Sequence, residues 1–77
     1  MSEYEWLNEF STNLNKLMRE AGYTQKELAE DTGLAESTIS RYMKGTQVPK
    51  ATAIVNIASV LLCDIDELID FGEDIVY

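Results

Sequence analysis

Residues 24–45 have the sequence TQKELAEDTGLAESTISRYMKG, which contains signals for two short helices and the turn between them. Thr24 precedes Glu27 by three residues, which is the spacing of a capping box. In this arrangement the threonine hydroxyl accepts a hydrogen bond from the glutamate amide, and the glutamate side chain reaches back to the threonine amide. The pattern predicts a helix over residues 25–32. Gly33 then ends it, because glycine readily adopts the left-handed conformation of a helix cap.

A second short helix is predicted over residues 36–43, where Ile39 and Tyr42 recur at helical spacing and Gly45 follows. The two helices are separated only by a tight turn. The small side chain of Ala29 in the first helix lets the second cross it closely. Two short helices joined in this way describe a helix-turn-helix motif.

The second helix has an outer face rich in polar side chains. Ser37 and Arg41 lie one helical turn apart on it, beside Glu36. A helix fits the major groove of DNA, where an arginine can bridge O6 and N7 of guanine and a glutamate can accept from N4 of cytosine. Thr38 and Ser40 can reach a base edge or a phosphate. The alternative is a solvent-facing surface on which Arg41 pairs with Glu36 or Ser37 and contacts no DNA.

Helical spacing also dominates outside this stretch. Apolar residues recur at steps of three and four along residues 6–21 and 51–61, and a second capping-box pattern opens at Asp64. No segment alternates convincingly with a period of two. We therefore predict an all-α domain over residues 1–72, with an acidic and apolar tail over residues 73–77 and five helices over residues 6–21, 25–32, 36–43, 51–61 and 65–71.

Residues 14–71 resemble the phage repressor/Cro-type family of DNA-binding domains, also called the xenobiotic-response-element family. The residues that carry the resemblance are Gln25, Leu28, Ala29, Gly33, Ile39, Gly45, Pro49, Ala58, Leu61 and Leu68. The resemblance implies a compact, five-helix lambda-repressor-like fold. It also implies sequence-specific binding of double-stranded DNA by a transcriptional regulator, with a repressor of phage or mobile-element type as the leading interpretation. Leu62 stands where the family usually has glycine, so we expect that turn to differ.

Contacts with DNA phosphates are expected around this helix. Gln25 begins a helix, and helix N-termini bind anions through their free amides. The resemblance gives Gln25 the same role and implies that Lys44, Thr46 and Lys50 contact the DNA backbone. The full set of predicted phosphate contacts is Gln25, Lys26, Ser40, Lys44, Thr46 and Lys50.

Composition argues against several other classes of protein. The chain has no histidine and one cysteine, Cys63, so neither a structural zinc site nor a nucleophile paired with histidine is expected. A domain of 77 residues also has little room for a substrate pocket. The longest apolar runs are too short to span a bilayer. We expect no enzymatic activity, cofactor, small-molecule ligand or membrane contact, and a cytoplasmic location.

The net charge of −8 is unusual for a DNA-binding protein. Residues 23–50 carry four basic and four acidic residues, whereas residues 51–77 carry six acidic residues and no basic residue. The excess acid therefore lies mainly outside the predicted motif. The competing hypothesis is an acidic protein-interaction module, such as an antirepressor or an antitoxin, and a third is the DNA-binding part of a longer polypeptide.

A homodimer is expected, because a single module makes few phosphate contacts. Apolar residues gather near the C-terminus beyond those that a small core needs. They are either a dimer interface or a surface that packs against Trp6 and the first helix. The candidate interface residues are Ile65, Ile69, Phe71, Ile75, Val76 and Tyr77.

Overall fold

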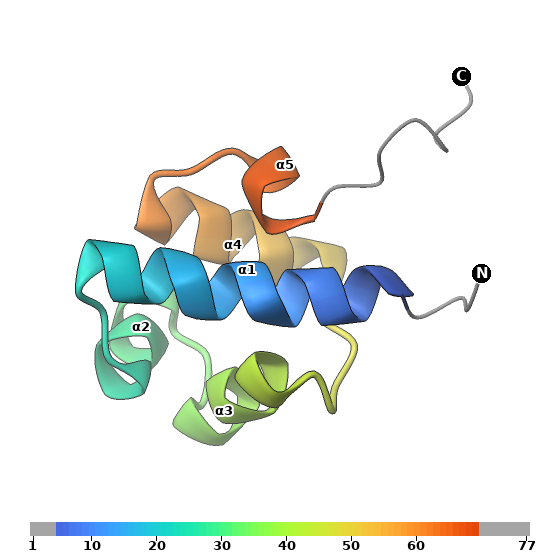
Figure 1. The fold of residues 1–77 in the computed structure, drawn as a ribbon. Helices are drawn as coiled ribbons and strands as arrows, with labels where there is room; N and C mark the ends of the chain where they lie inside the picture. Colours follow the sequence, from blue (N-terminus) through green and yellow to red (C-terminus); the bar gives the residue numbers. More distant parts are fainter. Residues whose placement is uncertain (1–4, 70–77) are drawn as a thin grey trace.

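The computed structural model describes residues 5–69, and five helices with no strand make up most of this part of the chain (Figure 1). The predicted all-α fold is confirmed, and the first four helices lie within one residue of their expected bounds. In order along the chain, the helices are α1 (Glu5–Ala21), α2 (Gln25–Thr32), α3 (Glu36–Lys44), α4 (Ala51–Leu61) and α5 (Ile65–Leu68).

The predicted end of the last helix was wrong. We expected a helix to Phe71, but α5 ends at Leu68 and Ile69 is extended, with φ −130° and ψ 112°. In a continued helix, Ile65 and Ile69 would share one face. The extended backbone instead places Ile69 in the core, 3 % exposed, while Ile65 stays 44 % exposed. Phe71 lies outside the described residues.

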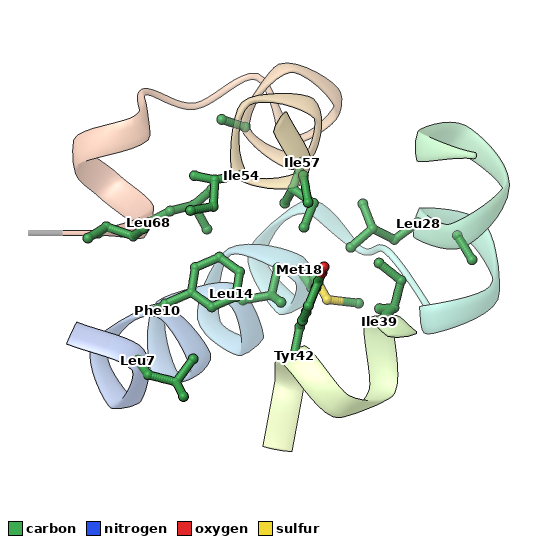
Figure 2. Packing of buried hydrophobic residues seen from close by; sticks show 14 residues of the cluster. Leu7, Phe10, Leu14, Met18, Leu28, Ile39, Tyr42, Ile54, Ile57 and Leu68 are labelled. Carbon is green, nitrogen blue, oxygen red and sulfur yellow. The ribbon is translucent and has the colours of Figure 1, made fainter. Parts of the chain in front are cut away.

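The core is assembled from all five helices. The amphipathic stripe of α1 supplies Phe10 and Leu14, and the other four helices each supply one fully buried aliphatic side chain: Leu28, Ile39, Ile57 and Leu68. Figure 2 shows these side chains converging between the helices. No polar side chain is buried in residues 5–69. Packing of apolar faces, together with hydrogen bonds at the helix ends, therefore holds the helices together.

Helix α1 lies across the middle of the domain. Helix α3 packs against α1 and α2, whereas α5 packs against α1 and α4. Figure 1 shows α2 and α3 on one side of α1 and α5 on the opposite side. The acidic residues of α5 and of the turn before it, Asp64, Asp66 and Glu67, are therefore remote from α3.

Side-chain amides close three of the helix C-termini. The last carbonyl groups of a helix have no partner within that helix. Three of them accept a hydrogen bond from an asparagine on a neighbouring helix: Thr32 from Asn56 (2.6 Å), Met43 from Asn15 (2.9 Å) and Leu68 from Asn13 (3.0 Å). These bonds link α2 to α4, and both α3 and α5 to α1.

The turn after α4 keeps the geometry of a glycine cap although it has none. Leu62 has φ 56° and ψ 44°, in the left-handed region that side chains with a Cβ rarely occupy. The amide of Cys63 donates to the carbonyl oxygen of Ala58 at 3.0 Å, as in a Schellman cap. The expectation that this turn differs was therefore wrong. The side chain of Leu62 is 92 % exposed, so its own burial does not offset the strain.

Candidate nucleic-acid interface

The helix-turn-helix is held in place by local hydrogen bonds. The hydroxyl of Thr24 accepts from the amide of Glu27 at 3.1 Å, and the Glu27 carboxylate accepts from the amide of Thr24 at 3.1 Å. The predicted capping box is thus confirmed. At the other end of α2, Gly33 has φ 76° and donates its amide to the carbonyl oxygen of Ala29. The left-handed glycine lets the chain turn sharply into α3.

Helix α3 has one buried face and one open face. Ile39 and Tyr42 are buried, and the ring of Tyr42 meets that of Phe10 edge to face, with 5.9 Å between the ring centroids. Thr38 and Ser40 are half-buried at the borders. The residues exposed to solvent on α3 are Glu36, Ser37, Arg41 and Lys44. As expected, Ser37 and Arg41 are exposed to solvent.

The guanidinium group of Arg41 is held by neighbouring side chains. Its Nε donates a hydrogen bond to Oε1 of Gln47, and its Nη2 donates to Oγ1 of Thr38 at 3.4 Å. Among the described residues, these are its hydrogen-bond partners, in place of the pairing with Glu36 or Ser37 that the sequence left open. Sequence reasoning missed Gln47, because it lies outside the recognition helix and no local pattern marks it.

The loop from α3 to α4 is anchored at both ends. At its start, the amide and the hydroxyl of Thr46 both donate to the carbonyl oxygen of Arg41, at 3.0 and 3.3 Å. At its end, Pro49 is buried, and the carbonyl oxygen of Lys50 accepts from the amide of Ile54 at 3.1 Å. The path of the loop is therefore fixed where it passes Arg41.

The predicted phosphate contacts lie on α2, on α3 and on the loop that follows it. Gln25 is the first residue of α2 and is half-buried, whereas Lys26 is exposed. Lys44 ends α3, and Lys50 is the N-cap of α4; both are exposed. Figure 1 shows α2 and α3 on the same side of α1. Their contacts with DNA stay predictions.

The model of the Cro/C1-type HTH DNA-binding domain family matches residues 13–74. This chain belongs to that family. It is thus a DNA-binding helix-turn-helix protein of the kind found in transcriptional regulators. None of the curated protein sequences compared with the chain matches it.

Two solved structures of transcriptional regulators are similar to this Cro/C1-type domain. The SOS-response transcriptional repressor LexA from Eubacterium rectale superposes with a TM-score of 0.80 at 25 % identity, over 100 % of this chain and 85 % of that one. A transcriptional regulator from Listeria innocua superposes with a TM-score of 0.75 at 27 % identity. The match covers 87 % of this chain and 63 % of the Listeria protein. Both similarities support the fold and the regulator class.

The predicted dimer patch of this Cro/C1-type domain must be revised. Ile69 belongs to the core of its own chain, because the backbone turns inward after α5, so it is not part of an exposed patch. Ile65 is exposed and remains a candidate. The other candidates, and the tail predicted over residues 73–77, lie outside the described residues: Phe71, Ile75, Val76 and Tyr77.

The α3 side of the domain carries exposed charges of both signs. Arg41, Lys44 and Lys50 are exposed there, on α3 and the loop that follows it. The acidic residues are Glu36 on α3 and Glu27, Glu30 and Asp31 on α2. Hydrogen bonds from Thr24 lower the pKa of Glu27, so this exposed carboxylate keeps its negative charge to a lower pH than usual. In residues 5–69 there is no cluster of potential metal ligands. No helix in this part of the chain is long and apolar enough to cross a membrane.

Proposed function

We propose that this Cro/C1-type domain reads one double-stranded DNA sequence by laying α3 in the major groove. Arg41 bridges O6 and N7 of a guanine, while Glu36, Ser37 and Thr38 contact neighbouring base edges. We further propose that the protein acts as a homodimeric repressor of the phage or mobile-element type. The repressor assignment draws on the similar LexA structure, whose protein is described as a transcriptional repressor.

One observation carries this proposal: the exposed Ser37 and Arg41 lie on a helix whose opposite face is locked into the core. A recognition helix needs this combination, because its side chains must reach base edges from a rigid support. A bidentate contact between an arginine and a guanine contributes about 1–3 kcal/mol of discrimination.

Dimerisation follows from the small number of basic residues near α3. Each phosphate contact contributes about −0.9 to the slope of log K against log salt concentration. The few contacts that one subunit offers give weak binding at physiological salt. Two subunits on half-sites about 34 Å apart double the number of contacts and read a symmetric sequence. The exposed Ile65 and the apolar residues beyond the described part of the chain are the candidate interface.

The test begins with selection of bound duplexes from a random pool. The affinity for the selected duplex is then measured by fluorescence anisotropy at several salt concentrations. Arg41→Ala is expected to weaken binding about 5- to 150-fold, the equivalent of one bidentate base contact. Lys16→Ala is the matched control, because it also removes one positive charge. Lys16 lies on the α5 side of the domain, where it lines a pocket together with Glu20 and Glu67. This substitution is expected to change the affinity by less than about twofold, since surface charges farther away than about 10 Å are screened.

The outcomes separate the proposed regulator from the acidic protein-interaction module. Enrichment of a symmetric site, with binding that weakens with salt and with Arg41→Ala, supports the proposed regulator. Failure to bind any duplex at about 50 mM salt, where electrostatic attraction is strong, would contradict it and favour an acidic protein-interaction module.

A further inference from the structure

We propose that Gln47 is a positioning residue, which fixes the edge of the Arg41 guanidinium that is presented to DNA. The proposal rests on the proposed function, because it concerns how Arg41 reads a base. It adds to the recognition site a residue of the α3–α4 loop, outside the helix that enters the groove.

The hydrogen bond from Arg41 to Gln47 occupies one edge of the guanidinium group. This group is planar and carries five N–H bonds in a fixed arrangement. One edge is formed by Nε and one N–H bond of Nη2, and the end is formed by Nη1 and the second N–H bond of Nη2. Gln47 accepts from Nε, so this bond lies on the first edge. Thr38 accepts from Nη2, which carries a second N–H bond. The end of the group remains available for O6 and N7 of guanine.

The position of Gln47 is fixed before any DNA binds. Thr46, next to it, donates two hydrogen bonds to the Arg41 carbonyl oxygen, and Pro49 is buried two residues further on. Gln47 itself is half-buried. A long arginine side chain normally loses rotamer freedom when it binds, and a fixed acceptor removes part of that loss in advance. Gln47 therefore increases both the affinity and the base selectivity of Arg41.

The proposal is tested with Gln47→Met, which keeps the length of the side chain but removes the acceptor. The probes are the selected duplex and copies in which each guanine in turn is replaced by adenine. The position read by Arg41 is the guanine whose replacement weakens binding of the parent protein but no longer weakens binding of the Arg41→Ala variant. At this position Gln47→Met is expected to reduce the preference for guanine about three- to tenfold, the equivalent of one hydrogen bond. Gln47→Glu, which restores the acceptor, is expected to keep the preference, although its added negative charge weakens overall affinity.

A double-mutant cycle separates positioning from direct contact with DNA. In the Arg41→Ala background, Gln47→Met is expected to change affinity by less than about twofold, because Gln47 then has no guanidinium to hold. A thermal unfolding curve like that of the parent would show that the fold is intact. If Gln47→Met weakens binding equally with and without Arg41, Gln47 contacts DNA itself and the proposal is wrong. It is also wrong if the parent binds and Arg41→Ala weakens binding while Gln47→Met changes nothing. Absence of DNA binding by the parent would instead overturn the proposed function.

Discussion

The side-chain amide of Asn15 in α1 donates a 2.9 Å hydrogen bond to the carbonyl oxygen of Met43, near the end of α3. Ser11, one turn earlier in α1, donates its hydroxyl to the same oxygen at 2.5 Å. Gly45 follows closely, and a Cβ atom at that position would lie 3.5 Å from Cβ of Ser11. The end of the recognition helix is thus attached to the longest helix of the described domain by polar bonds as well as by apolar packing.

Because Ser11 and Asn15 share one acceptor, we predict that the effects of substituting them on the free energy of unfolding are not additive. Ser11→Ala or Asn15→Ala alone leaves the Met43 carbonyl with one partner and is expected to cost about 0.5–1.5 kcal/mol of the free energy of unfolding. The double variant leaves it with none, which costs about 1–3 kcal/mol more. Urea denaturation of the parent, the two single variants and the double variant measures the coupling. Simple additivity would mean that the two bonds do not stabilise the same attachment.

Leu62 offers a prediction of opposite sign, because its replacement by glycine should stabilise the protein. Its left-handed backbone costs about 1–2 kcal/mol, and its side chain is almost fully exposed, so little burial is lost. Glycine increases the freedom of the unfolded chain by about 0.4–1 kcal/mol, which leaves a net gain of about 0.5–1 kcal/mol for Leu62→Gly. Thermal unfolding would show this as a higher Tm.

Leu62→Ala is the control for this gain, because alanine removes the side chain but keeps a Cβ atom in the left-handed backbone. It is expected to leave the Tm nearly unchanged. A lower Tm for both variants would indicate that the Leu62 side chain makes a contact in solution, for example with a second copy of the chain.

We expect Glu27 to make the stability of the protein depend on pH in the acidic range. Its hydrogen bonds with Thr24 favour the charged carboxylate and lower its pKa below 4.5 in the folded protein. As the pH falls, the unfolded chain therefore binds the proton first. The stability that Glu27 contributes is fully present well above pH 4.5 and is lost as the pH falls through the folded pKa.

Glu27→Gln keeps an acceptor for the Thr24 amide but cannot titrate, so it is the matched variant. The parent is expected to lose more stability than Glu27→Gln between about pH 5 and 3, while the difference between them stays constant above about pH 6. Parallel stability curves over the whole range would show that this carboxylate titrates alike in both states.

The features that the sequence predicted correctly are set by neighbours in the chain. The capping box of Thr24 and Glu27 and the glycine caps at Gly33 and Gly45 depend on residues within one helical turn of each other. Apolar spacing likewise placed the helices and their buried faces, and the open face of α3 followed from its buried one. Local chemistry was therefore sufficient for the fold and for the exposed position of Arg41.

The features that the sequence missed depend on how distant segments meet. Ile69 is extended and packs in the core, where α5 meets the other helices. The strained turn at Leu62 connects α4 to α5, and these two helices pack against each other. Asn56 meets Thr32 across 24 residues of sequence. Gln47 reaches Arg41 only because the loop is anchored on both sides. No pattern in the neighbouring sequence marks these features, so they can be found only in the assembled structure.

Amide chemical shifts can show directly whether DNA binds the open face of α3. The parent protein labelled with ¹⁵N is titrated with the selected duplex, and the shift changes are mapped onto the structure. We predict that the largest changes fall on Ser37, Thr38 and Arg41 and on the amides at the start of α2, while Asp66 and Glu67 of α5 hardly move. Changes concentrated on α5, with α3 unaffected, would show that DNA does not bind the open face of α3.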